Sequence, residues 1–246
     1  MERVTGQAWS RPDEKQKPDA DFKRLPDHAC YMAWQPACVP HTGRMMDRHA
    51  TFPAASARYG TQDTLVEALP LDGVYVLTPP SGHPVRAGRP DAALLRQIGM
   101  DGHFTHDTCL LSHHKDHVRG LYCQTEPAPQ GRLVQCEHGA VWNVVVDVRT
   151  GSPTFGQWAA DILSAENRRQ LWIPPGFLHG TCTLEDHTAL RCHCTSAPDR
   201  RYERTVRWND EALGIAWPVA DMHAILSPRD QAAAPFFSVI DWFPYP

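Results

Sequence analysis

Short apolar runs separated by turn-forming residues are the feature that most limits what this chain can fold into. Each run has about the 4–8 residues of a buried strand, and no long helical pattern lies between them. Strands this short and this frequent are typical of a sandwich or barrel rather than an α/β sheet. We therefore predict an all-β fold with strands at Val118–Gln124, Arg132–Cys136, Val141–Val148, Gln157–Leu163, Gln170–Ile173, Phe177–Leu184 and Ala189–Thr195.

A few other elements are expected on either side of these strands. Gly73–Leu77 reads as a strand that ends in the breaker run Pro79-Pro80-Ser81-Gly82. A short helix is expected at Asp91–Ile98, after Pro90. Ser227-Pro228-Arg229-Asp230 has the order of a helix start, with serine as N-cap, proline at the first position and an acid at the third.

The first part of the chain has a different character. Residues 1–62 show no sustained period of 2 or 3.6, and they contain Pro12, Pro18, Pro26, Pro36, Pro40 and Pro53. Such a stretch has little apolar surface with which to offset the entropy of ordering. We predict an irregular extension over 1–62, and one β domain over 63–246.

The composition argues against two classes of partner. A net charge of −4 gives no reason to expect nucleic acid or an anionic membrane as a partner. No run approaches the roughly 20 apolar residues of a membrane helix, and the first residues lack the apolar core of a signal peptide. We expect a cytoplasmic protein.

The eight cysteines do not suggest a disulfide framework or a zinc site. No Cys-x-x-Cys pair occurs, and a chain of this length can build a core without covalent staples. Most of the cysteines lie within apolar, strand-like segments. We expect reduced and mostly buried thiols.

Two sequence blocks resemble the signature of one enzyme family. They read VDVRTGSPTFGQW at Val146–Trp158 and LSAENRRQLWIPPGFLHGTCTL at Leu163–Leu184. Shorter blocks in the same order are VRGL at Val118–Leu121, GRLV at Gly131–Val134, VRWND at Val206–Asp210 and LSPRD at Leu226–Asp230. Together they resemble the dTDP-4-dehydrorhamnose 3,5-epimerases of deoxysugar biosynthesis. The resemblance implies a cupin-type jelly-roll barrel, a homodimer, and activity without metal or organic cofactor.

The resemblance also implies a particular proton chemistry on a dTDP-linked 4-keto-6-deoxyhexose. The ketone acidifies the protons on its neighbouring carbons, C3 and C5. A base removes one of these protons, an enolate forms, and an acid returns a proton from the other face. A cation or hydrogen-bond donor in a dry pocket stabilises the enolate oxygen.

Several site residues carry over from the family to this chain. Arg119 matches an arginine that faces the substrate, and Arg132 stands where the family has a lysine. His179 matches a pocket histidine, and Asp230 matches the aspartate that orients the catalytic histidine. Gln124 keeps the glutamine of its block and is expected to contact substrate.

The catalytic positions themselves depart from the family. Tyr122 occupies the place of the general-base histidine. The acid tyrosine expected soon after Cys194-Thr195 is absent, and the next tyrosine is Tyr202. His106 and Thr108 replace a Gln-x-Asn pair that lines the pocket. We therefore take Tyr122, Asp230 and His179 as candidate catalytic residues, and we take Arg119, Arg132, His106 and Gln124 as substrate-binding.

The first departure has a calculable cost. An unperturbed tyrosine has a pKa of about 10, against about 6.5 for histidine. About one tyrosine in 1,000 is a phenolate at neutral pH, a deficit of roughly 4 kcal/mol for a base. Two functions stay open: an isomerase with rearranged acids and bases, acting at one or both carbons, or a repurposed member that binds a sugar nucleotide or a partner without epimerising it.

Three of these features have simpler explanations. Asp230 can cap its helix. His179 can be a satisfied core histidine. The cluster from His113 to His117 suggests a metal site, but its spacing suits an exposed loop better than one face of a strand, and we expect no metal.

Overall fold

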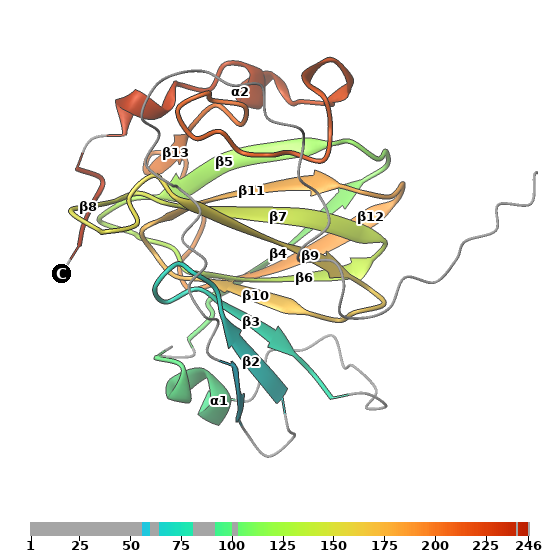
Figure 1. Cartoon of the computed structure of the whole chain (residues 1–246), viewed down its shortest axis with the longest axis vertical. Coiled ribbons are helices and arrows are strands. Elements are labelled where there is room, and N and C mark those ends of the chain that lie inside the picture. Colours follow the sequence, from blue (N-terminus) through green and yellow to red (C-terminus); the bar gives the residue numbers. More distant parts are fainter. Residues whose placement is uncertain (1–55, 60–63, 81–91, 100–102, 240, 246) are drawn as a thin grey trace, which may run out of the picture. The chain divides into compact units, whose positions relative to one another are not determined.

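The computed structural model describes residues 56–59, 64–80, 92–99, 103–239 and 241–245 (Figure 1). Its strands are β1 (Ser56–Tyr59), β2 (Thr64–Ala68), β3 (Tyr75–Thr78), β4 (His106–Ser112), β5 (Val118–Gln124), β6 (Arg132–His138), β7 (Ala140–Asp147), β8 (Arg149–Thr150), β9 (Trp158–Ser164), β10 (Gln170–Ile173), β11 (Phe177–Thr183), β12 (Thr188–Cys194), β13 (Glu203–Thr205) and β14 (Phe243–Pro244). Its helices are short: α1 (Ala92–Gln97), α2 (Pro228–Gln231) and the 3₁₀ turns η1 (Asp221–His223) and η2 (Phe236–Ser238).

Two antiparallel sheets make up most of this structure. The larger has the order β1-β2-β3-β10-β6-β12-β4, and the smaller has the order β13-β5-β11-β7-β9. Strands β8 and β14 form a separate parallel pair. The predicted all-β class is confirmed.

The apolar core lies between the two sheets and is supplied by alternate residues of their strands. In β7, Val141 and Val145 belong to the same buried cluster as Val134 of β6, in the facing sheet. Val144 and Val146 point the other way, into a second cluster on the outer face of the smaller sheet. Burial on both faces explains why β7 reads in the sequence as a continuous apolar run rather than an alternating one.

The C-terminal part of the chain covers the outer face of the smaller sheet. Figure 1 shows this red segment, with α2, lying over β5. Trp142 of β7 packs against Trp217 with ring centroids 5.0 Å apart, and Trp208 packs on Trp217 at 5.4 Å. The indole Nε1 of Trp217 donates to the carbonyl of Trp208 at 2.8 Å, so the buried polar atom is paired.

A buried aspartate organises the turn that follows β7. Asp147 is fully buried and accepts hydrogen bonds from Arg149, Ser152 and Thr154. Burial alone would raise the pKa of Asp147, but these hydrogen bonds outweigh burial and hold the pKa below its ordinary value.

Most predicted strands coincide with observed ones, and the observed strands without a predicted counterpart include β2, β4, β8 and β13. The strand predicted at Gly73–Leu77 is β3, and the predicted helix at Asp91–Ile98 is α1. The N-cap of α2 is confirmed, because Ser227 Oγ accepts from the backbone N–H of Asp230. Strand β1 lies inside the range 1–62 that was predicted to be irregular; the rest of that range, residues 1–55 and 60–62, lies outside the described residues.

Candidate active site

A bulge in β5 turns Arg119 and Tyr122 toward the same side. Tyr122 pairs with His179 of β11 and Arg119 pairs with Thr181, so three residue steps in β5 face two in β11. Paired residues of antiparallel strands share a face, and residues two apart in a strand share a face. Arg119 and Tyr122 therefore lie on one face despite their odd spacing. His179 also pairs with Val145, a residue of the core between the sheets, so this shared face is the interior of the barrel.

The facing wall comes from the larger sheet. Cys194 of β12 pairs with Arg132 of β6 on one side and with His106 of β4 on the other. Cys194 belongs to the core between the sheets, so Arg132 and His106 lie on the inner face of their sheet as well, although His106 is exposed at its end of β4. The two walls thus bring together five of the seven predicted site residues: Arg119, Tyr122, Arg132, His106 and His179.

Tyr122 is held in its protonated form. Burial raises the pKa of its phenol above the ordinary value, and the nearby carboxylate of Asp230 adds to this, while Arg119, Arg132 and Arg229 act in the opposite direction. The guanidinium of Arg229 lies 5.6 Å from the ring centroid. A phenol in this state is a proton donor at neutral pH, so Tyr122 cannot take over the base role of the histidine it replaces.

His179 is a neutral imidazole in a fixed orientation. It is 6% exposed, and its Nε2 lies 3.1 Å from Oδ1 of Asn143. The amide nitrogen of Asn143 donates to the carbonyl of Val141, which leaves Oδ1 to accept from the imidazole. The imidazole hydrogen is therefore on Nε2, and Nδ1 carries no hydrogen. Burial, aided by the charge of Arg132, lowers the pKa of His179 to about 3.

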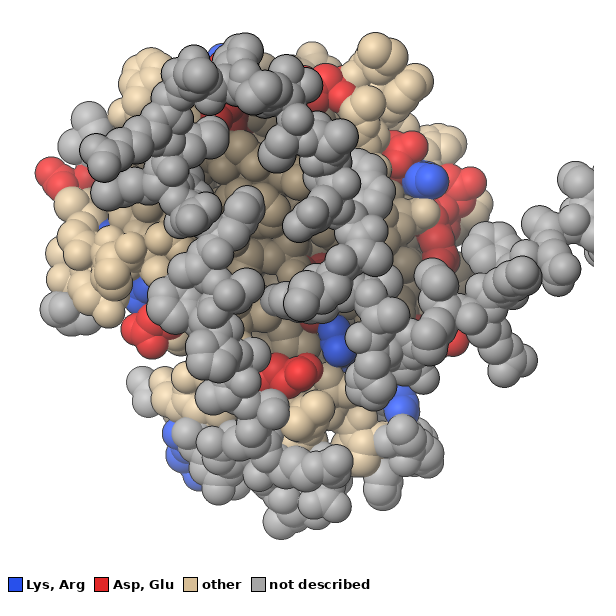
Figure 2. All heavy atoms as spheres, viewed as in Figure 1, with Lys and Arg blue, Asp and Glu red and all other residues tan. Residues whose placement is uncertain are grey.

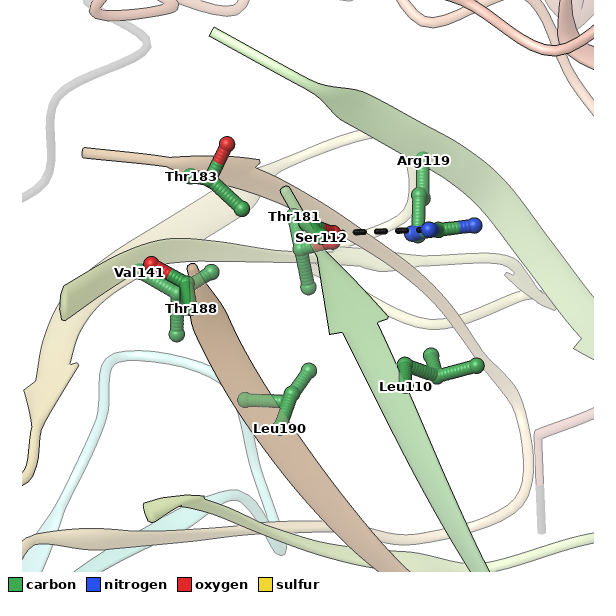
Figure 3. A pocket seen from close by; sticks show the side chains of 8 residues that line it. All are labelled: Leu110, Ser112, Arg119, Val141, Thr181, Thr183, Thr188 and Leu190. Carbon is green, nitrogen blue, oxygen red and sulfur yellow. Dashed lines mark hydrogen bonds between the residues drawn. The ribbon is translucent and has the colours of Figure 1, made fainter. Parts of the chain in front are cut away.

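Arg119 reaches into a small hollow between the two sheets. Figure 3 shows the side chains that line it: Leu110, Ser112, Arg119, Val141, Thr181, Thr183, Thr188 and Leu190. The Nη2 atom of Arg119 is 3.4 Å from both the carbonyl of Leu111 and the hydroxyl of Ser112. Its Nε is buried and has no hydrogen-bond partner among the described residues. A buried N–H without a partner is costly, so this position favours an acceptor brought by a ligand.

The hollow is too small for a whole sugar nucleotide. Its empty volume is about 210 Å³, including the part open to solvent. Pockets for small ligands usually measure about 300–1,000 Å³. We conclude that, in this hollow, Arg119 can contact only one chemical group of a larger ligand.

Asp230 has two structural partners. It is 3% exposed, and its Oδ2 accepts from the hydroxyl of Ser227 at 2.7 Å. Its Oδ1 lies 3.3 Å from the backbone N–H of Gly120, at the bulge of β5. Asp230 therefore caps α2 and also anchors α2 to the strand that carries Arg119 and Tyr122.

Gln124 holds two loops together. Its Nε2 donates to the carbonyls of Ala128 and Ala197 and lies 3.3 Å from the hydroxyl of Ser196. Its Oε1 accepts from the backbone N–H of Asp199 at 2.8 Å. Because its amide is engaged with protein groups, this geometry favours a structural role over the predicted contact with substrate.

The histidine-rich segment lies in the connection between β4 and β5. His113, His114 and Lys115 are exposed there, as expected for a loop. The backbone N–H of Lys115 donates to Asp186. Within the described ranges, no group of three or more His, Cys, Asp or Glu side chains is arranged to hold a metal ion.

The described part of one face of the molecule does not favour one sign of charge. On the face seen in Figure 2, acidic and basic side chains are interspersed wherever residues are described. None of the described helices is long and apolar enough to cross a bilayer.

Comparison with known proteins gives the family. The profile of the dTDP-4-dehydrorhamnose 3,5-epimerases matches residues 90–238. The chain belongs to this family. It is 45% identical over 115 residues to a dTDP-4-dehydrorhamnose 3,5-epimerase of Sinorhizobium fredii, an alignment that covers 47% of this chain and 58% of the relative. The chain thus matches just over half the length of this curated epimerase.

Solved epimerase structures superpose over most of the β domain. A dTDP-6-deoxy-D-glucose-3,5-epimerase from Legionella pneumophila, in complex with dTDP-4-keto-L-rhamnose, is 33% identical with a TM-score of 0.67. The superposition covers 74% of this chain and 98% of that one. A 3′-monoepimerase from Streptomyces bikiniensis in complex with dTDP-quinovose is 30% identical with a TM-score of 0.61, covering 68% and 85%. The predicted cupin-type jelly roll is confirmed.

Several polar residues of this epimerase-family interior were not among the predicted site residues. Asn143 is fully buried and orients His179. Cys192 and Cys194 were taken only as buried thiols, although their spacing of two within a predicted strand puts both on one face. That spacing is the signal that could have found them.

Proposed function

We propose that this protein is a dTDP-sugar isomerase that removes and returns a proton next to the 4-keto group of a dTDP-4-keto-6-deoxyhexose, as in dTDP-rhamnose biosynthesis. The observation that carries the proposal is the convergence of Tyr122, His179, Arg119 and Arg132 on the interior of one barrel. The ligand named for the Legionella structure is a sugar nucleotide of this class. The reaction is a proton relay, so it requires no organic cofactor or metal.

The two arginines suit different parts of such a ligand. Arg132 lies close enough to Tyr122 and His179 to act on the pKa of each, so its charge is available where an enolate oxygen develops. Arg119, with its unpaired buried Nε, can bind a further oxygen of the same ligand.

We further propose a cytoplasmic homodimer. The six described cysteines are free thiols, the state expected in a reducing compartment. Strand β4 is an edge of the larger sheet among the described strands, and Leu111 on it is 53% exposed. An exposed edge with apolar side chains is a natural surface for a second chain.

Deuterium exchange tests the proposed reaction directly. The protein is incubated with dTDP-4-keto-6-deoxyglucose in D₂O, and NMR follows deuterium at C3 and C5. We expect incorporation at both carbons; incorporation at one alone would indicate a monoepimerase, as in the Streptomyces bikiniensis relative. Binding of dTDP without exchange at either carbon would contradict isomerase activity and favour a repurposed binding protein.

A further inference from the structure

The wall that faces Tyr122 carries a pair of thiols. Cys192 and Cys194 lie two residues apart on β12, and their Sγ atoms are 3.8 Å apart. Both belong to the core between the two sheets, together with Leu190 of the same strand. Tyr122 lies on the inner face of the opposite sheet. The thiols and the phenol therefore face the same interior from opposite sheets.

The surroundings of Cys194 stabilise a thiolate. Either thiol of the pair can donate to the other, and this contact lowers the pKa of Cys194 below its ordinary value, although burial and the charge of Asp107 act against this. The charge of Arg132 and a hydrogen bond from Thr108 also lower that pKa. The same contact and burial raise the pKa of Cys192, so this pair loses its first proton from Cys194.

Buried thiols elsewhere in the fold behave differently. Cys123 and Cys182 belong to the cluster on the outer face of the smaller sheet. Burial raises the pKa of each to about 12. A low thiol pKa is thus not general in this protein, and Cys194 owes it to its position beside Arg132, Thr108 and Cys192.

We propose that Cys194 is the general base that takes the substrate proton, and that Tyr122, on the opposite wall, is the acid that returns one. This inference rests on the proposed isomerase function. In the relay implied by the resemblance, the strand of Tyr122 carries the base. In the proposed relay that strand carries the acid, and the opposite wall carries the base. The proposed relay also accounts for both departures together, since the chain lacks the usual base histidine and the usual acid tyrosine.

The proton transfers balance without a further reagent. The thiolate of Cys194 forms an S–H bond with the proton of the carbon beside the ketone, and the C–H electron pair becomes the enolate double bond. The carbonyl electrons move onto oxygen, where Arg132 faces the developing charge. The Tyr122 hydroxyl then gives its proton to the opposite face of that carbon, and the carbonyl reforms. The phenolate takes a proton from water and the Cys194 thiol releases one to water, which restores both groups.

Substitution of Cys194 separates this inference from the proposed function. Cys194→Ser keeps the size but not the acidity of the thiol, so we expect C3 and C5 deuterium exchange to fall about 10²–10⁴-fold, with dTDP binding retained. Cys182→Ala, on the outer face, is the matched control and should exchange at the wild-type rate. If the wild type exchanges and Cys194→Ser exchanges equally well, the inference fails alone; if the wild type does not exchange, the isomerase function fails.

A second readout does not depend on turnover. The rate of iodoacetamide labelling at Cys194, measured by mass spectrometry across pH, reports its thiolate fraction. The charged and titratable groups that face or adjoin this thiol are Arg132, Cys192, His106, Asp107, Tyr122 and His179. Cys192→Ala removes the neighbouring thiol whose contact lowers the pKa of Cys194, so we expect the Cys194 labelling midpoint to move to higher pH. The pH profile of exchange should move by the same amount; an unmoved exchange profile beside a moved labelling midpoint would overturn the assignment of Cys194 as base.

Discussion

At the scale of single residues, Tyr122 shows how one substitution changes which group can give and which can take a proton. Tyr122→Phe removes the donor, and we expect deuterium exchange to fall by about 10² or more. Tyr122→His restores a group with an ordinary pKa of about 6.5, which can both donate and accept near neutral pH. The carboxylate of Asp230, which already acts on the pKa of Tyr122, would orient such an imidazole.

The two variants are compared by the same NMR assay at pH 6–8. We expect the histidine variant to exchange at least about tenfold faster than the phenylalanine variant, since only histidine offers a proton. Equal rates in both would show that no proton passes through position 122. Binding of dTDP, measured by calorimetry, should be alike in the two variants.

At the scale of elements, the bulge in β5 depends on the absence of a side chain at Gly120. Its φ is +115°, and a Cβ there would lie 2.7 Å from the carbonyl oxygen of His179 and 2.8 Å from the Cα of Gly180. Both are backbone atoms of β11, so the two strands would have to move apart. We expect Gly120→Ala to lower the free energy of unfolding by about 3 kcal/mol or more, as measured by urea denaturation.

A second glycine separates backbone strain from the close approach of the strands. Gly151 has a φ of +90°, but a Cβ there meets nothing within 4 Å. Gly151→Ala should therefore lose only about 1 kcal/mol, the cost of the left-handed conformation. A loss as small in Gly120→Ala would contradict the tight contact between β5 and β11.

The turn after β7 should depend on pH through one carboxylate. The pKa of Asp147 is lower in the folded chain than in the unfolded one, so its contribution to stability is present above the unfolded pKa of about 3.9. That contribution is lost as the pH falls through the folded pKa. Asp147→Asn should lower the free energy of unfolding by about 3 kcal/mol at pH 7, because it weakens a buried carboxylate–arginine contact.

Urea denaturation of both proteins from pH 7 to pH 2 provides the measurement. The difference between wild type and Asp147→Asn should shrink below about pH 4. A difference that stays constant over this range would show that the charge of Asp147 does not matter. The matched control is Asp199→Asn, which breaks a solvent-screened ion pair with Arg201; the pKa of Asp199 is also lowered, but its effect on the profile should be much smaller than that of Asp147→Asn.

The strands that are easiest to predict from the sequence include those whose faces are both buried. β7 and β10 are apolar apart from Asn143, Asp147 and Gln170, and their predicted positions hold to within one residue. β4 was not predicted, because an edge strand with mostly exposed side chains carries no apolar period. Its pairing with β12 is what places His106 opposite Cys194 and Thr108 opposite Cys192. Residue pairing across strands was also needed to establish the bulge in β5, since Gly120 suggests a bulge but does not show that Arg119 and Tyr122 come to share a face.

At the scale of the whole molecule, the edge strand β4 makes the proposed dimer testable. Leu111 on β4 is 53% exposed and its neighbour Leu110 is 38% exposed. A lysine on an exposed strand edge opposes pairing with a second chain, because its charge would be buried without a partner. We expect the wild type to sediment as a dimer at micromolar concentration. Leu111→Lys should raise the dissociation constant of the dimer by at least about tenfold and so shift the protein toward monomer.

Met222→Lys is the matched control, since Met222 is 85% exposed on η1, away from any strand edge, and its sedimentation should equal that of the wild type. A wild-type monomer at all concentrations would contradict the homodimer itself, whereas a dimer that Leu111→Lys leaves intact would place the interface away from β4. Since His106, a candidate substrate-binding residue, lies on the same strand, an interface at β4 would also adjoin the candidate site, and dissociation in Leu111→Lys should then lower deuterium exchange along with dimer content.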